Sequence, residues 1–401
     1  MRTRKMPSIT GGILLVIGNV IGAGILALPI AIAQLGLPAA ILILVLFWLL
    51  MMAGAFYFLE ANLALPSGSN LISMSRRALG KPGVALAWIC NLLVMYSLIA
   101  AYMSGGGDLV KINFHYLGLT LPSWSASILF LLVFGFIVTR GIHITDQANR
   151  VLMISKAIIF FVTVLGITAY FNSDIISYVP QKSLSASLLI IVITSFGFAP
   201  LIPSLRSYYQ SDVKKLKKII FWGTFIPLVC YILWVTVIFS VVPYAGSDGL
   251  EQIAQSGHPV SDLQSALSQA LHIQWITQAT NIFSSICIIT SFLANSISLT
   301  DFLADGLKLN QGHKKAWSVY LIAYLPAISA VLFYQKAFLA GLSIAGTLAI
   351  IQLLILPGLI VWGLRYTRSK MPLQYSVTGG KSSLALLLSI SVVLFILTII
   401  L

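Results

Sequence analysis

The chain has 401 residues, of which 59% are hydrophobic and only 8% are charged. Soluble domains carry a charge on about a quarter of their residues, so this composition excludes an ordinary soluble protein. The formal net charge is +14, which in a soluble chain would suggest a nucleic-acid partner. Here the basic residues gather in short gaps between apolar runs, so we expect a lipid bilayer and no nucleic acid around the chain.

Apolar runs long enough to cross a bilayer recur along the whole sequence. Crossing the hydrocarbon core takes about 20 residues of helix, and a helix satisfies its own backbone hydrogen bonds without water. A β-barrel would show short alternating segments instead. We therefore predict one all-α integral membrane domain, residues 1–401, with eleven transmembrane helices. The predicted helices cover residues 8–34, 37–64, 84–108, 124–140, 150–171, 186–208, 219–243, 275–301, 316–334, 338–364 and 383–401.

The lysine and arginine residues predict the orientation of these helices. Cytoplasmic loops of membrane proteins are enriched in both residue types. With a cytoplasmic N-terminus, 21 of the 24 basic residues lie on the cytoplasmic side. The outer side carries Lys111, Lys182 and Lys336. We therefore predict a multi-pass protein of the plasma membrane whose C-terminus, after an odd number of helices, lies outside.

One outer loop, residues 244–274, is longer than the others and contains a helical pattern. Val260, Leu263, Leu267 and Leu271 recur at helical spacing within Pro259–His272. This predicts a short amphipathic helix on the outer face. The helix either packs over an outer vestibule or lies on the surface without a role in transport.

Glycine and proline interrupt the first and the sixth predicted helices near their middles. Residues 18–29 read GNVIGAGILALP and residues 194–203 read TSFGFAPLIP. Both residue types weaken or break helices, and irregular backbone at membrane depth is tolerated where it lines a cavity or is buried in protein. In the alternative interpretation, Gly18, Gly22 and Gly24 are small residues that serve helix packing.

Two such breaks predict a binding site for a zwitterion. A helix that starts at a break presents free N–H groups, which suit a carboxylate, and one that ends there presents free C=O groups, which suit an ammonium or a cation. The breaks are five helices apart, so the two helices cross the membrane in opposite directions. This predicts a 5+5 inverted repeat with a midplane site. The repeats are residues 1–171 and 186–364, and the helix at 383–401 is an addition.

Residues 18–29 resemble the first helix of the hydroxy and aromatic amino acid permeases, a family that contains bacterial tyrosine and tryptophan permeases. The resemblance covers nearly the whole chain and is closer to the tyrosine permeases. It implies a LeuT-type fold with helices 1 and 6 broken at the midplane, in the bacterial inner membrane. It also implies a non-enzymatic function, which is import of aromatic amino acids, tyrosine favoured, by proton symport and alternating access.

The resemblance further implies roles for residues at the two breaks. The amide groups expected to hold the substrate carboxylate belong to Gly22, Ala23 and Gly24. The carbonyl groups expected to face its amine belong to Asn19, Val20 and Ile21. The residues of the sixth helix expected to lie opposite are Ser195, Phe196, Gly197 and Phe198. One of the two phenylalanines would form an aromatic wall for the substrate, unless both face core or lipid.

Tyr96 is a further candidate, because the third helix crosses the middle of the membrane near residues 91–100. A tyrosine hydroxyl in a membrane interior needs a hydrogen-bond partner. Either the substrate or a neighbouring helix would supply that partner.

Lys156 is the candidate for coupling transport to an ion. Charged side chains inside a span are costly and usually functional, and Lys156 lies about two turns into the fifth helix, roughly 10 Å from its start. It either extends to the cytoplasmic surface or lies between helices 1, 5 and 8, where its ammonium replaces a cation and exchanges a proton. The competing prediction is a sodium site at Thr290 and Ser291. No other cofactor or metal is expected.

Few other charges lie in the predicted helices, and most of them lie near helix ends. Glu60, Asp108, Asp301 and Asp305 are each expected to reach interfacial water. Asp301 is also predicted to act as an inner gate by pairing with Arg2, Arg4 or Lys5.

Other classes of membrane protein have less support in the sequence. The chain has no G-x-x-x-x-G-K-[ST] motif of an ATP-driven pump and no H-E-x-x-H motif of a metalloprotease. A channel is the main alternative to a carrier, and a sodium-coupled amino acid symporter is the main alternative mechanism. The choice among tyrosine, tryptophan and phenylalanine, the stoichiometry and the oligomeric state stay open.

Overall fold

A computed structural model describes residues 8–140, 142–177, 186–307, 310–311, 314–334, 336–367 and 374–400. The regular structure in these ranges is helical, apart from two paired two-residue strands, β1 (Asn310–Gln311) and β2 (Lys314–Lys315). The basic residues 2–5, which the gate prediction for Asp301 requires, lie outside the described residues. Asp301 itself is exposed on the helix that ends at Gly306.

The helices follow one another along the chain with short connections. In the first half they are α1 (Ile9–Val20), α2 (Gly24–Ile32), α3 (Gly36–Leu63), α4 (Leu71–Leu79), α5 (Lys81–Tyr116), α6 (Ser123–Thr139), α7 (Ile142–Thr168) and α8 (Ser173–Ile176). In the second half they are α9 (Ala186–Ser195), α10 (Ile202–Tyr208), α11 (Val213–Phe239), α12 (Leu250–Gln255), α13 (Pro259–Leu271), α14 (Gln274–Gly306), α15 (Trp317–Phe333), α16 (Ala337–Ile350), α17 (Leu356–Trp362) and α18 (Gly380–Ile400). Two π-helical turns, Ile351–Ile355 and Gly363–Thr367, follow α16 and α17.

Most of the long helices have the length and composition of membrane spans. Within the described residues, eight helical stretches are long and apolar enough to cross a membrane. They are Gly24–Leu63, Lys81–His115, Val151–Thr168, Ile190–Tyr208, Val213–Phe239, Gln274–Gly306, Ala337–Thr367 and Gly380–Ile400. Three shorter apolar helices are Ile9–Val20, Ser123–Thr139 and Trp317–Phe333. The chain is therefore an all-helical, multi-pass membrane protein.

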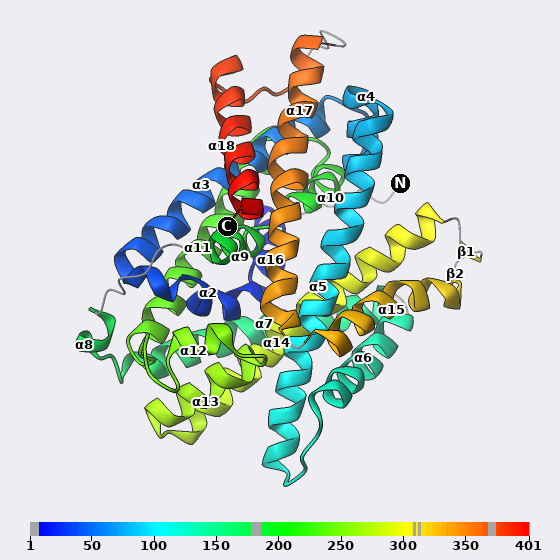
Figure 1. Cartoon of the computed structure of the whole chain (residues 1–401). Helices are drawn as coiled ribbons and strands as arrows, with labels where there is room; N and C mark the ends of the chain where they lie inside the picture. The colour runs from blue at the N-terminus through cyan, green and yellow to red at the C-terminus, as the bar shows by residue number, and fades with distance from the viewer. Residues whose placement is uncertain are drawn as a thin grey trace.

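Helix α5 runs through most of the molecule and packs against α6, α14, α15 and α16 (Figure 1). Glycines make these close approaches possible. A Cβ on Gly107 would lie 2.2 Å from the Ser127 hydroxyl of α6, and a Cβ on Gly105 would lie 2.7 Å from the Phe338 ring of α16. Larger residues at either position would push these helices apart.

The two ends of the molecule differ in structure. Helix α4 lies at one end and α13 at the other (Figure 1). The amphipathic helix predicted within Pro259–His272 is confirmed, since α13 covers Pro259–Leu271. Val260, Leu263, Leu267 and Leu271 are all buried, and α13 packs on α2, α5 and α14. The apolar stripe therefore serves to attach this loop to the bundle.

The expectation that Glu60 reaches water is wrong. Its side chain on α3 is only 1% exposed and receives two hydrogen bonds from Arg365, each 2.5 Å long, from Nε and Nη2. The backbone N–H of Val377 donates a third at 2.8 Å. The end of the α17 segment and the chain before α18 cover the carboxylate. Glu60 thus joins three parts of the chain that are far apart in sequence.

The same expectation is wrong for Asp108 near the far end of α5. Its side chain is 3% exposed and lies 2.7 Å from Nδ1 of His258, just before α13. The other ring nitrogen of His258 lies 3.2 Å from the Ser123 hydroxyl, which also accepts from Lys111 at 3.2 Å. His258 therefore links α5, α6 and the start of α13, and it covers the carboxylate that the sequence placed in water.

Candidate functional site

Two interrupted helices meet inside the bundle. Helix α1 ends at Val20 and α2 begins at Gly24, while α9 ends at Ser195 and the chain resumes helical turns at Ala199. Helix α2 packs on α9. A Cβ on Gly24 would lie 2.6 Å from the Ser195 hydroxyl and 3.2 Å from its Cα. The glycine therefore lets the start of α2 touch the end of α9.

Helix α14 supports the first interruption from another side. The backbone N–H of Ala23 donates to the Ser291 hydroxyl at 3.0 Å. A Cβ on Gly22 would lie only 2.4 Å from the same oxygen. The Ser291 hydroxyl in turn donates to the carbonyl of Cys287 at 2.8 Å, so its proton is used within α14 and a lone pair faces Ala23. The glycine–alanine pair thus rests directly on α14.

Lys156 of α7 enters the same region from a third side. Its side chain is 5% exposed, so it does not extend to the surface. The ammonium donates to the carbonyl of Ile21 at 2.5 Å and to the carbonyl of Gly18 at 3.5 Å. Its third partner is the hydroxyl of Thr290 on α14, at 3.4 Å. These partners are all neutral oxygens, and they come from α1, the interruption that follows it and α14.

The carbonyl groups at the end of α1 are therefore already in use. The carbonyl of Ile21 accepts from Lys156, and the carbonyl of Val20 accepts from the backbone N–H of Gly22 at 2.8 Å. Asn19 is exposed at the surface of α1, next to Gly18, whose missing side chain leaves room for Met153 of α7.

Tyr231 of α11 is a residue at this site that sequence reasoning missed. Its hydroxyl lies 2.6 Å from the carbonyl oxygen of Val20 and 2.8 Å from that of Ser195. The side chain is fully buried, and its ring meets Phe196 edge-on at a centroid distance of 5.2 Å. One side chain therefore touches the ends of both interrupted helices. A single tyrosine inside an apolar run is typical of a buried core residue. The sequence therefore gives no indication that Tyr231 contacts both interrupted helices.

The aromatic candidates after α9 are both enclosed. Phe196 and Phe198 are each 1% exposed. Between them, the N–H of Gly197 donates to the carbonyl of Thr194 at 3.2 Å, and a Cβ on Gly197 would lie at the same distance from that oxygen. The turn is therefore tight at the glycine, and Phe196 packs toward Tyr231.

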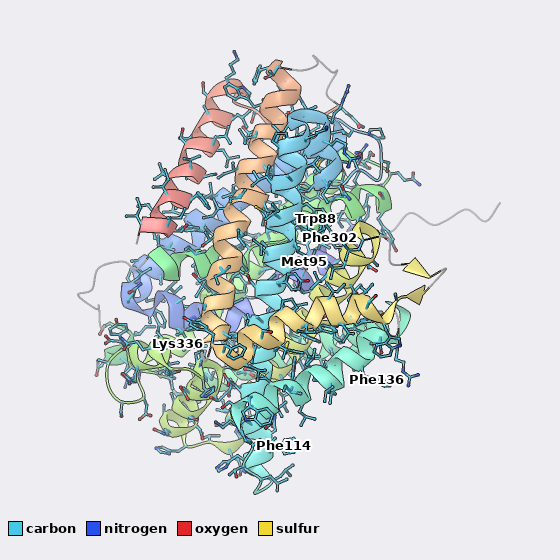
Figure 2. All side chains as sticks on the ribbon, turned by 45° about the vertical axis from the view of Figure 1, so that its right-hand side comes forward. Trp88, Met95, Phe114, Phe136, Phe302 and Lys336 are labelled. Carbon is cyan, nitrogen blue, oxygen red and sulfur yellow. The ribbon has the colours of Figure 1, made fainter. Side chains whose placement is uncertain are left out.

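Tyr96 lies in a different environment. Its hydroxyl donates to the carbonyl of Ile322 on α15 at 2.8 Å, which is the neighbouring-helix partner that the sequence left open. Two turns earlier on the same helix, Trp88 packs against Phe302 of α14 with ring centroids 5.2 Å apart (Figure 2). The structure gives the Tyr96 hydroxyl a structural partner, so we do not retain it in the candidate site.

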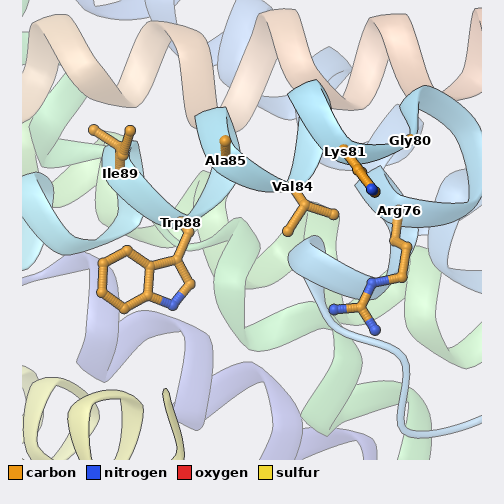
Figure 3. A pocket seen from close by; sticks show the side chains of 7 residues that line it. All are labelled: Arg76, Gly80, Lys81, Val84, Ala85, Trp88 and Ile89. Atoms are coloured by element: carbon orange, nitrogen blue, oxygen red, sulfur yellow. The ribbon is translucent and has the colours of Figure 1, made fainter. Parts of the chain in front are cut away.

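A cavity of 740 Å³ opens where α4 meets the start of α5 (Figure 3). It is lined by Arg76, Gly80, Lys81, Val84, Ala85, Trp88 and Ile89. These residues belong to neither interrupted helix, so this cavity is separate from the candidate site. Among the described residues, no group of three His, Cys, Asp or Glu side chains is placed to hold a metal ion.

Interrupted helices that meet inside a multi-pass helical bundle, with backbone groups and a buried ammonium at the meeting point, define a membrane transport protein. Residues 5–398 match the tryptophan/tyrosine permease family. The chain belongs to this family, whose members are transport proteins and not enzymes.

Relatives with assigned functions match over almost their whole length. The chain is 30% identical to the tyrosine-specific transport system 2 of Haemophilus influenzae over 96% of this chain and 95% of that protein. It is 29% identical to the tryptophan-specific transport protein of the same organism, over 95% of this chain and 93% of that protein. Among solved structures, a crystal structure of the Eremococcus coleocola manganese transporter, in complex with an aromatic bis-isothiourea substituted compound, covers 98% of this chain and 85% of its own. Its TM-score is 0.64 at 15% identity, so the likeness concerns the fold alone.

Proposed function

We propose that this protein is a secondary active transporter that imports aromatic amino acids, tyrosine favoured, by proton symport through alternating access. The main support for this proposal is that two helix interruptions meet at Gly24 and Ser195, and that the buried ammonium of Lys156 contacts the first of them. The names of the relatives, tyrosine-specific and tryptophan-specific, support an aromatic substrate.

The proposed architecture has eleven spans in a LeuT-type arrangement. We assign α1 with α2, and α9 with α10, to the first and sixth spans, each broken at the midplane. The packing of helices supports an inverted repeat. The third span, α5, packs on the tenth, α16, and the eighth, α14, packs on the fifth, α7. A shift by five spans turns one of these pairs into the other. The repeats then cover residues 1–171 and 186–364, with α18 outside them.

The proposed orientation has the N-terminus in the cytoplasm and the C-terminus outside, in a bacterial inner membrane. The basic residues near α4, such as Arg76 and Lys81, then lie on the cytoplasmic side, and α13 lies on the outer side. This assignment rests on the enrichment of lysine and arginine in cytoplasmic loops.

The proposed substrate site uses backbone groups for the zwitterion and rings for the side chain. The start of α2 at Gly24 provides N–H groups for the carboxylate, because a helix start carries a partial positive charge. The end of α9, at Ser195, provides a carbonyl group for the ammonium, because the carbonyl groups at the end of α1 already have donors. Phe196 and Phe198 border the turn after α9 and favour an aromatic side chain through offset or edge-to-face contact.

Lys156 carries the proposed proton coupling. Its ammonium has three oxygen partners of the kind that a sodium ion would bind, namely two carbonyls and a hydroxyl. A lysine that loses its proton keeps two N–H groups but no charge, so these bonds weaken and one of the three acceptors loses its donor. Proton release therefore loosens the contact between α7 and the first interruption. The Thr290 and Ser291 hydroxyls would be left as ligands for sodium only if the ammonium moved away.

Uptake of radiolabelled tyrosine into proteoliposomes tests the proposed function. We expect accumulation that is driven by an imposed pH gradient, acidic outside, and competed by tryptophan or phenylalanine. Accumulation that requires a sodium gradient would contradict proton symport while leaving a carrier. Flux that never exceeds equilibrium under either gradient would contradict secondary active transport, and flux that does not saturate would contradict the carrier and favour a channel.

A further inference from the structure

The hydroxyl of Tyr231 faces two hydrogen-bond acceptors with one proton. The carbonyl oxygens of Val20 and Ser195 lie 2.6 and 2.8 Å from it, and both belong to the last residue of a helix. A hydroxyl donates one hydrogen bond. Carbonyl groups at a helix end carry the negative end of the helix dipole and lack a partner within the helix. At any moment one of the two carbonyls therefore lacks the tyrosine proton.

The two carbonyls differ in what else they receive. Val20 also accepts the N–H of Gly22 at 2.8 Å, so it keeps one donor when the tyrosine proton turns away. Ser195 depends more strongly on Tyr231, whose hydroxyl is the donor that the structure gives it among the described residues. A buried carbonyl without a donor is costly. The tyrosine proton therefore favours Ser195 when the site is empty.

A primary ammonium would change this balance. It brings three donors, and the end of α9 offers it a carbonyl with the charge it requires. Once the ammonium donates to Ser195, the tyrosine proton is free to turn to Val20, and every carbonyl has a donor. A ligand without the ammonium cannot make this exchange.

We propose that Tyr231 is a positioning residue that satisfies the Ser195 carbonyl in the empty site and turns to Val20 when the α-ammonium group of a substrate occupies Ser195. This inference rests on the proposed function, since it assumes an amino acid at the two interruptions. In the empty site, the Tyr231 hydroxyl lies between the ends of α1 and α9 and donates to α9. In the loaded site, the substrate ammonium makes the contact with α9 and the hydroxyl donates to α1.

The test compares two ligands on purified, full-length protein in detergent. Dissociation constants are measured for tyrosine and for 3-(4-hydroxyphenyl)propionate, which is the same molecule without the amine. The quantity compared between variants is the dissociation constant of the amine-free analogue divided by that of tyrosine, which measures the preference for tyrosine. In wild type we expect a strong preference for tyrosine. In Tyr231→Phe, which keeps the ring against Phe196, we expect this ratio to rise about tenfold in favour of tyrosine, because the Ser195 carbonyl then lacks a donor in the empty site and the ammonium supplies one; a buried acceptor without a donor is worth a factor of this order.

Tyr57→Phe is the matched control. Tyr57 is also a buried tyrosine, and its hydroxyl lies 2.8 Å from that of Ser383 on α18, away from either interruption. We expect this variant to leave the ratio unchanged. A merely structural role of Tyr231 would weaken both ligands equally, so an unchanged ratio in Tyr231→Phe overturns the inference. If wild type binds neither ligand, the proposed function fails instead, and the two failures are thereby distinguished.

A second measurement retains the hydroxyl and covers the case in which Tyr231→Phe does not fold. The protein is prepared with 3-fluorotyrosine at position 231, and its ¹⁹F resonance is followed during titration. We expect tyrosine to shift the resonance, because the hydroxyl changes its acceptor, and the amine-free analogue to leave it in place. Equal shifts with both ligands would contradict the exchange of acceptors.

Discussion

The ammonium of Lys156 donates a 2.5 Å hydrogen bond to the carbonyl of Ile21, the residue directly after α1. This contact places a titratable group on the backbone of an interrupted helix. Its other partners, Gly18 and Thr290, extend the contact to α1 and α14. A change in the charge of one side chain is thus transmitted to the element that we propose binds the substrate carboxylate.

The contact between Gly24 and Ser195 predicts the effect of adding one methyl group. In Gly24→Ala the new Cβ would lie 2.6 Å from the Ser195 hydroxyl, so the two interruptions must separate. Overpacking of this kind costs about 1–3 kcal/mol, and we expect the affinity for tyrosine to fall about tenfold. Binding by the purified variant, checked by its thermal melt, measures the effect.

Gly11→Ala serves as the control for that variant. Its Cβ would lie 3.6 Å from the Ser8 hydroxyl, an ordinary contact near the start of α1, and we expect no loss of affinity. The double variant Gly24→Ala with Ser195→Gly should recover part of the loss, since it removes the clashing hydroxyl. Full affinity in Gly24→Ala alone would contradict the close approach of the interruptions.

The buried pair of Glu60 and Arg365 predicts a large effect on stability. In Glu60→Gln the guanidinium, only 8% exposed, loses its counter-charge in the interior. Breaking a buried pair by removing one partner costs about 3–5 kcal/mol. We expect a markedly lower midpoint of denaturation in detergent. Glu60→Leu combined with Arg365→Met should recover most of the loss, because no charge is then left buried. Equal stability of Glu60→Gln and wild type would show that water reaches the pair.

The pair of His258 and Asp108 predicts a dependence of stability on pH. The hydrogen bond that His258 donates to the Asp108 carboxylate raises the pKa of His258 above its usual value, despite partial burial and the repulsion from Lys111. A raised pKa in the folded state stabilises the protein fully below the unfolded value of about 6.5, and this stabilisation is lost as the pH rises through the folded pKa.

The test is the difference in thermal stability between wild type and His258→Gln as a function of pH. We expect wild type to be more stable near pH 6.5 and the difference to shrink toward pH 9. Because the histidine side chain is 35% exposed, the effect should stay below about 1 kcal/mol. Asp262 contributes a smaller attraction to the same histidine, so Asp262→Asn should reduce the difference without removing it. A difference that grows with pH would contradict the assignment.

Much of the helical framework could be predicted from the sequence, because glycine, proline and apolar runs act locally. The interruptions at Gly22–Gly24 and around Gly197 appear where these residues weaken a helix. The end of α5 could not be predicted: it continues to Tyr116, eight residues past Asp108, since His258 covers that carboxylate. In a sequence, a charged residue such as Asp108 indicates the end of a membrane helix unless the distant residue that pairs with it is known.

The same reason explains which parts of the site were missed. Lys156 was recognised because a charge in an apolar run is unusual, although its burial could not be decided from the sequence. Tyr231 carries no such signal, and its partners Val20 and Ser195 are 211 and 36 residues away. Arg365 lies 305 residues from Glu60, so only the folded chain shows that they pair.

Proton-driven accumulation of tyrosine by Lys156→Met, compared with wild type, tests the central claim most directly. Methionine fills a similar volume without a charge, and Lys214→Met on the exposed start of α11 is the control. The account predicts that Lys156→Met still exchanges tyrosine across the membrane of proteoliposomes but no longer accumulates it under a pH gradient, while the control behaves as wild type. Equal accumulation and equal affinity in Lys156→Met and wild type would contradict it.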